Sequence, residues 1–69
     1  MKLSARNILK GTVVKVVTGS VNSEVVVQIA GGAHVVSIIT NEAVASLGLK
    51  PGVPAYAVIK ASNVMIAVD

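Results

Sequence analysis

The chain has 69 residues and contains no cysteine, so a single small domain without disulfide bonds is expected. Apolar residues make up 54% of the chain and charged residues 13%, with a formal net charge of +3. The 6 lysines and arginines are scattered along the sequence, and Tyr56 is the only aromatic residue. Proteins that bind single-stranded nucleic acid stack bases on aromatic side chains, so nucleic acid is not expected as a partner.

The high apolar content points to a subunit interface rather than to a membrane. Polar residues such as Lys15, Glu24 and Lys60 interrupt each apolar run before the roughly 18 residues that a spanning helix needs. No hydrophobic segment follows the cationic first residues, so no secretory signal is expected and a cytoplasmic location follows. A domain of this size buries only about 60% of the surface of its unfolded chain, which leaves it marginal as a monomer. We therefore expect a homo-oligomer.

Three β-strands are predicted in the first half of the chain. Valine and isoleucine dominate Leu9–Val17, Asn22–Ile29 and Ala33–Ile39. These β-branched side chains favour a pleated surface over a helix. Gly31 and Gly32 provide the positive φ angles of a tight turn, so the three strands form a meander.

One short helix is predicted at Asn41–Leu47, where good helix formers replace the β-branched pattern. Thr40 or Asn41 is expected to cap its start, and Gly48 to cap its end. A turn at Lys50-Pro51-Gly52 follows the helix.

Two further strands, Ala55–Lys60 and Asn63–Val68, complete the predicted set. Five strands with a single helix between the third and fourth is the order of elements in an OB-type barrel. The expected fold is therefore all-β, a small five-stranded OB-fold-like barrel. A small open sheet and an SH3-like barrel have a similar rhythm and remain open as alternatives.

The sequence offers no catalytic constellation. His34 is the only histidine, and it follows a predicted turn, so we expect an exposed strand residue rather than a base or a ligand. The acidic residues Glu24, Glu42 and Asp69 fall on a strand, a helix start and the last position, and nothing brings two of them together. We expect neither an enzyme nor a bound metal cation.

Two short motifs near the two ends of the chain place a hydroxyl and a cation two residues apart, on one face of a strand. Ser4 and Arg6 form the first pair, and Lys60 and Ser62 form the second. All these groups donate hydrogen bonds, and a deprotonated tetrahedral dianion has only acceptors. The pairs are the best candidates for a small-oxyanion site, although a solvated strand surface often shows the same pattern.

Two other places could favour an anion. Thr40 lies at the predicted helix start, where free N–H groups such as that of Ala43 favour negative charge. The carboxylate of Glu42 would repel a dianion there unless it faces away. The Thr18-Gly19-Ser20 turn could present backbone amides as a small nest, although a plain hairpin loop explains it as well.

Several segments, in order along the whole chain, resemble the molbindins, the small Mop-family proteins that bind molybdate and tungstate. The segments that carry the resemblance are Ser4–Asn7, Leu9–Gly11, Asn22–Val25, Ile29–Gly32, Ser37–Ile39 and Ile59–Met65. The Ser-Ala-Arg-Asn opening, together with the distant Lys-Ala-Ser, is the specific part.

The resemblance implies a single Mop domain over residues 1–69, with an OB-like fold and no cofactor. It implies a homohexamer built as a trimer of dimers, with molybdate or tungstate bound between subunits for storage or homeostasis. The implied oxyanion-binding residues are Ser4, Arg6, Thr40, Ala43, Lys60, Ala61 and Ser62. Ala43 stands where related regulator domains carry a serine, so only its backbone amide could serve. A second site near a three-fold axis would use Gly19, Ser20 and Val21.

We expect Arg6 and Lys60 of neighbouring subunits to neutralise the bound dianion through charge-assisted hydrogen bonds. Phosphate should be disfavoured, because it is partly protonated at neutral pH and its proton needs an acceptor. Sulfate also lacks a donor, so only cavity size could exclude it. The competing interpretation is a non-catalytic OB-like interaction module, or a regulatory domain without a storage role.

Overall fold

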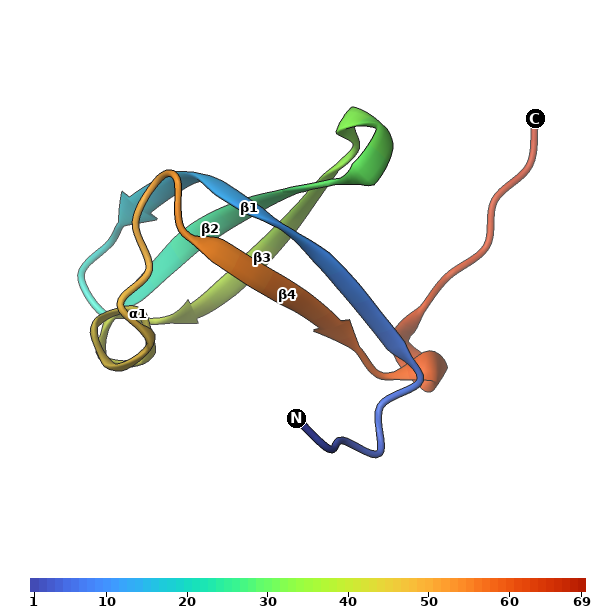
Figure 1. The fold of residues 1–69 in the computed structure, drawn as a ribbon, viewed down its shortest axis with the longest axis horizontal. Coiled ribbons are helices and arrows are strands. Elements are labelled where there is room, and N and C mark those ends of the chain that lie inside the picture. Colours follow the sequence, from blue (N-terminus) through green and yellow to red (C-terminus); the bar gives the residue numbers. More distant parts are fainter.

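The computed structural model describes residues 1–69, which form one curled antiparallel sheet and a single α-helix (Figure 1). The sheet has four strands in the order β3-β2-β1-β4. The strands are β1 (Asn7–Thr18), β2 (Asn22–Ile29), β3 (His34–Thr40) and β4 (Pro54–Ile59). Helix α1 (Asn41–Leu47) connects β3 to β4, and two short 3₁₀ turns, η1 (Ala30–Gly32) and η2 (Ala61–Asn63), follow β2 and β4.

Buried valines on the concave face of the sheet form the core. Val13 of β1 and Val25 and Val27 of β2 form a buried cluster. Partly buried residues pack around it: Val16, Ile29, Ile39, Val44, Leu49 and Ala55. Gly11 is required where β1 crosses β2, because a Cβ there would collide with the carbonyl oxygen of Gln28.

The predicted elements are confirmed over most of the chain. Strand β2 and helix α1 occupy the predicted residues, and the other three strands shift by one or two residues at their ends. Thr40 rather than Asn41 is the N-cap of α1, since its Oγ1 accepts the Ala43 N–H at 3.1 Å. Gly48 ends the helix in the left-handed conformation, with φ of 65°.

The predicted fifth strand, Asn63–Val68, is wrong for the single chain. Residues 61–63 form η2 instead, and residues 64–69 extend from it without entering the sheet (Figure 1). The apolar pattern there is typical of a strand, but a strand also needs a neighbouring edge, and η2 directs the segment away from β4. The predicted all-β, OB-like class is confirmed, with an open half-barrel in place of five closed strands.

The hydrophobic core is small compared with the apolar surface. Only Val13, Val25, Val26 and Val27 are buried hydrophobic residues, whereas 15 large hydrophobic side chains are exposed. No helix of the structure is both long and apolar enough to cross a membrane. The chain therefore has much more apolar surface than its own fold covers.

Candidate functional site

Pairing between β1 and β4 brings the two hydroxyl-and-cation motifs together. The strands run antiparallel, with Asn7 of β1 opposite Ile59 of β4. The side-chain Nδ2 of Asn7 also donates a hydrogen bond to the Ile59 carbonyl oxygen at 3.2 Å. Arg6 precedes one member of this pair and Lys60 follows the other, so the two cations leave the same end of the sheet.

A shallow hollow at this end of the sheet, which we term the anion hollow, is lined by Ser4, Ala5, Arg6, Lys60, Ala61 and Ser62. Its lining contains two cations, two hydroxyls and no carboxylate. The arrangement differs from the expectation that Arg6 and Lys60 come from different subunits, because both belong to one chain. A surface with this donor set attracts a small anion.

The backbone of η2 adds to the donor character of the anion hollow. The N–H of Asn63 donates to the Lys60 carbonyl at 2.9 Å, and the N–H of Val64 donates to the Ala61 carbonyl at 3.3 Å. In these two bonds, Lys60 and Ala61 use only their carbonyl groups. The N–H groups of Ala61 and Ser62 donate no turn or loop hydrogen bond. The first N–H groups of a helical turn have no partner inside the turn and favour negative charge.

The structure does not bring Thr40 and Ala43 to the anion hollow. Strand β1 runs from Asn7, beside the hollow, to Thr18 at the opposite end of the sheet, where α1 begins (Figure 1). The Ala43 N–H that was expected to face an anion is satisfied by Thr40 Oγ1 within the same chain. Because Thr40 only accepts in this bond, its own O–H is still available to donate. Within one chain, these two residues therefore cannot complete the anion hollow.

The turn between β1 and β2 is held against the start of α1 by Asn41. Its Nδ2 donates to the Gly19 carbonyl at 2.9 Å, and its backbone N–H donates to the Val21 carbonyl at 2.8 Å. The buried Ser23 hydroxyl donates to Asn41 Oδ1 at 2.5 Å. The N–H of Gly19 is used by the Asn22 carbonyl at 2.8 Å, whereas those of Ser20 and Val21 have no hydrogen bond. Two of the three predicted amides of the second site are thus free.

Sequence reasoning missed the positioning roles of Asn7 and Asn41. Asn7 belongs to the Ser-Ala-Arg-Asn motif, and its side chain hydrogen-bonds across the β1–β4 pair. Asn41 was considered only as a helix cap. An amide side chain carries both donors and an acceptor, so an asparagine at the end of a strand is the signal that could have indicated such a bridge.

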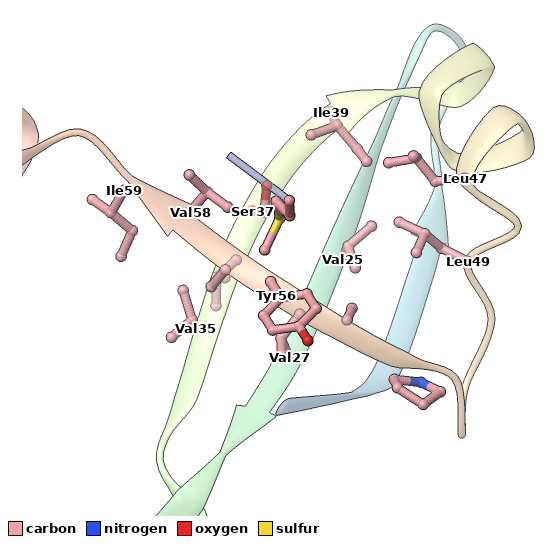
Figure 2. A pocket seen from close by; sticks show the side chains of 15 residues that line it. Val25, Val27, Val35, Ser37, Ile39, Leu47, Leu49, Tyr56, Val58 and Ile59 are labelled. Atoms are coloured by element: carbon pink, nitrogen blue, oxygen red, sulfur yellow. The ribbon is translucent and has the colours of Figure 1, made fainter. Parts of the chain in front are cut away.

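A second concavity lies on the inner face of the sheet, with a volume of about 690 Å³ (Figure 2). It is lined by 15 residues, of which 13 are hydrophobic, and they come mainly from β2, β3 and β4. Ser37 and the Tyr56 hydroxyl are its polar contributions. No charged side chain lines this concavity, so it does not offer the paired cations of the anion hollow.

Comparison with known proteins agrees with the fold and with the motifs. Residues 3–66 match the TOBE domain. The chain belongs to the TOBE-domain family. Within it, the chain groups with the Mop proteins: it is 53% identical over 66 residues to molybdenum-pterin-binding protein 3 of Clostridium pasteurianum, covering 96% of this chain and 97% of the relative.

Two solved Mop-type structures share the fold. MopII from Clostridium pasteurianum superimposes with a TM-score of 0.91 at 48% identity, over 97% of this chain and 100% of MopII. The cytoplasmic molybdate-binding protein ModG, solved with molybdate bound, superimposes with a TM-score of 0.91 at 60% identity. That match covers 94% of this chain and 46% of ModG.

Proposed function

We propose that this protein binds molybdate, and also tungstate, in the anion hollow, and that it serves intracellular molybdenum storage and homeostasis without catalysing a reaction. The observation that carries this proposal is the pairing of Asn7 with Ile59, which places Arg6 and Lys60 at one end of the sheet. The relatives support the ligand, because ModG was solved with molybdate bound and the clostridial relative is a molybdenum-pterin-binding protein.

The chemistry of the anion hollow matches a tetrahedral dianion. Arg6 and Lys60 supply charge-assisted hydrogen bonds, and Ser4 and Ser62 supply neutral ones. MoO₄²⁻ and WO₄²⁻ have four oxygen acceptors and no proton at neutral pH. Phosphate is partly protonated at that pH, and no acceptor side chain lines the hollow for its proton. Phosphate should therefore bind more weakly than molybdate.

The anion hollow needs a second chain to bind a dianion tightly. Arg6, Lys60 and Ser62 are exposed, so water competes with the anion in the isolated chain. In the proposed assembly, a homohexamer built as a trimer of dimers, a neighbouring copy covers the hollow and contributes its Thr40 hydroxyl and the backbone at Ala43. The 15 exposed large hydrophobic side chains support association of this extent.

A second, weaker oxyanion site is proposed at the turn formed by Gly19, Ser20 and Val21. The free N–H groups of Ser20 and Val21 support it, and the Asn41 hydrogen bonds hold the turn in place. The N–H of Gly19 already has an intrachain acceptor, so Gly19 would contribute conformation rather than a hydrogen bond.

Titration calorimetry tests the function with the wild-type chain and two charge-removing variants. Arg6→Ala should weaken molybdate binding at least tenfold, because an ionic hydrogen bond contributes about 1.5–3 kcal/mol. Lys10→Ala is the matched control, since Lys10 is an exposed cation of β1 outside the hollow. The molybdate affinity of this variant should stay within about twofold of the wild-type value, as expected for an exposed side chain. Sulfate and phosphate are titrated under the same conditions.

Equal losses of molybdate affinity in Arg6→Ala and Lys10→Ala would show that only the net charge of the protein matters. That result would contradict the proposed site. Absence of heat with every oxyanion at millimolar concentration would leave the alternative, a non-catalytic interaction module or regulatory domain.

A further inference from the structure

The side chain of Asn41 holds the β1–β2 turn at both of its ends. Its Nδ2 donates to the Gly19 carbonyl at 2.9 Å, and its Oδ1 accepts the Ser23 hydroxyl at 2.5 Å. Gly19 precedes and Ser23 follows the residues Ser20 and Val21, whose N–H groups donate no turn or loop hydrogen bond. We term the turn formed by Gly19, Ser20 and Val21 the turn site, because it is the proposed second oxyanion site.

The hydrogen bond to Gly19 sets the direction of the Ser20 N–H. The chain has no cis peptide bond, and in a trans peptide the carbonyl of one residue and the N–H of the next point in opposite directions. Because the Gly19 carbonyl points to Asn41, the Ser20 N–H points away from Asn41. Rotation of this peptide unit would redirect the Ser20 N–H and would also break the hydrogen bond to Asn41.

The two partners of the Asn41 side chain allow only one orientation of its amide. A carbonyl oxygen only accepts, so the Gly19 carbonyl requires the Nδ2 of Asn41 and excludes its Oδ1. Ser23 is 2% exposed, so water does not replace Asn41 Oδ1 as the partner of its hydroxyl. The buried Ser23 hydroxyl therefore anchors the amide that holds the turn.

The backbone of Asn41 connects the same turn to Thr40. The Asn41 N–H donates to the Val21 carbonyl at 2.8 Å, and this N–H belongs to the peptide unit that joins Thr40 to Asn41. Thr40 is also held by its own side chain, since its Oγ1 accepts the Ala43 N–H at 3.1 Å. The hydroxyl that the anion hollow of a neighbouring copy would use is thus attached to backbone that the turn site holds.

We propose that Asn41 is a positioning residue shared by the two oxyanion sites. Its side chain directs the Ser20 N–H of the turn site, and its backbone fixes Thr40 for the anion hollow of a neighbouring copy. Asn41 acts through these residues and contacts neither anion. This inference rests on the proposed function, and it names the residue through which the geometry of one site depends on that of the other.

Asn41→Leu tests the shared role, because leucine has a similar size but no hydrogen-bonding group. Titration calorimetry with molybdate measures the turn site in an Arg6→Ala background, where the anion hollow is weakened, and measures the hollow as the tighter phase when Arg6 is present. Asn41→Leu should weaken the turn site at least about tenfold, because the Ser20 N–H loses its fixed direction toward the anion. The hollow should weaken at least about threefold, because Thr40 is then held less firmly.

Gly48→Ala is the matched control for lost stability. Gly48 ends α1 with φ of 65°, and an added Cβ would meet nothing within 4 Å, so alanine costs only backbone strain there. Both affinities of this variant should stay within about twofold of the wild-type values. Urea unfolding measures the stability of each variant. Ser23→Ala is a second test, because it retains Asn41 and removes only the anchor of its amide, and it should weaken the turn site at least about threefold.

An Asn41→Leu protein that loses stability as Gly48→Ala does but keeps both affinities would overturn the proposal. A loss at the turn site alone would overturn the shared role, because Thr40 would then be independent of the turn. If Asn41→Leu does not fold, wild-type affinity at the turn site of Ser23→Ala overturns the proposal instead. Wild-type protein that binds molybdate in a single phase, abolished by Arg6→Ala, retains the proposed hollow and removes the shared role, whereas wild-type protein that binds no oxyanion removes both.

Discussion

Asn41 shows how one side chain fixes the geometry of a turn far from it in sequence. The side chain links the Gly19 carbonyl and the Ser23 hydroxyl, and the Asn41 backbone N–H adds a hydrogen bond to the Val21 carbonyl. Ser23 is only 2% exposed, so its hydroxyl depends on the Asn41 oxygen for a partner. An unsatisfied buried polar group is costly, and this bridge therefore stabilises the start of α1 and the β1–β2 turn together.

Asn41→Ala should lower the free energy of unfolding by about 1–3 kcal/mol, because it leaves the buried Ser23 hydroxyl without an acceptor. Gln28→Ala is the control, since Gln28 is an exposed amide for which the structure shows no side-chain hydrogen bond, and it should change stability by less than about 0.5 kcal/mol. Urea unfolding at one fixed protein concentration measures both. Equal effects of the two substitutions would contradict the role of the bridge.

At the scale of elements, Thr40 has two separable roles. Its Oγ1 caps α1 by accepting the Ala43 N–H, and its O–H is the group that the proposed site would use from a neighbouring chain. Thr40→Val keeps the shape but removes the acceptor, so the free energy of unfolding should fall by about 1 kcal/mol. Thr40→Ser retains the hydroxyl and should behave like the wild type.

Calorimetry with the same two variants separates the cap from the site. Thr40→Val should also weaken molybdate binding, while Thr40→Ser should leave the affinity within about threefold of the wild-type value. This range corresponds to less than about 0.7 kcal/mol. A Thr40→Val variant that is less stable but binds molybdate as tightly as the wild type would restrict Thr40 to its capping role.

The strands and the helix could be predicted because local chemistry determines them. Valine runs such as Val25–Val27 and the cap pair of Thr40 and Gly48 need no distant partner to specify their conformation. The fifth strand could not be placed, because Val64–Asp69 needs an edge that its own chain does not present after η2. For the same reason, the motifs of Arg6 and Lys60 were found from the sequence, but their meeting within one chain required the register of β1 and β4.

At the scale of the whole molecule, the anion hollow, η2 and the exposed residues 64–69 are continuous along the chain. Lys60, Ala61 and Ser62 line the hollow, η2 spans Ala61–Asn63, and the exposed segment follows at once. An anion bound by Lys60 and Ser62 would fix the turn from which the segment departs. Ligand binding and association of chains are therefore expected to be coupled, and the coupling is reciprocal.

This coupling predicts that molybdate lowers the protein concentration at which the assembly dissociates. A ligand that binds only the assembled form at 100 times its dissociation constant stabilises that form by about 2.7 kcal/mol per site. Sedimentation velocity over a dilution series, with molybdate or with sodium chloride of equal ionic strength, measures the shift. Lys10→Ala should respond like the wild type and Arg6→Ala should not respond, because Arg6 lines the hollow and Lys10 does not. If molybdate binds with full affinity but leaves the dissociation concentration unchanged, the site lies within one chain, and Thr40 of a neighbour does not contribute to it.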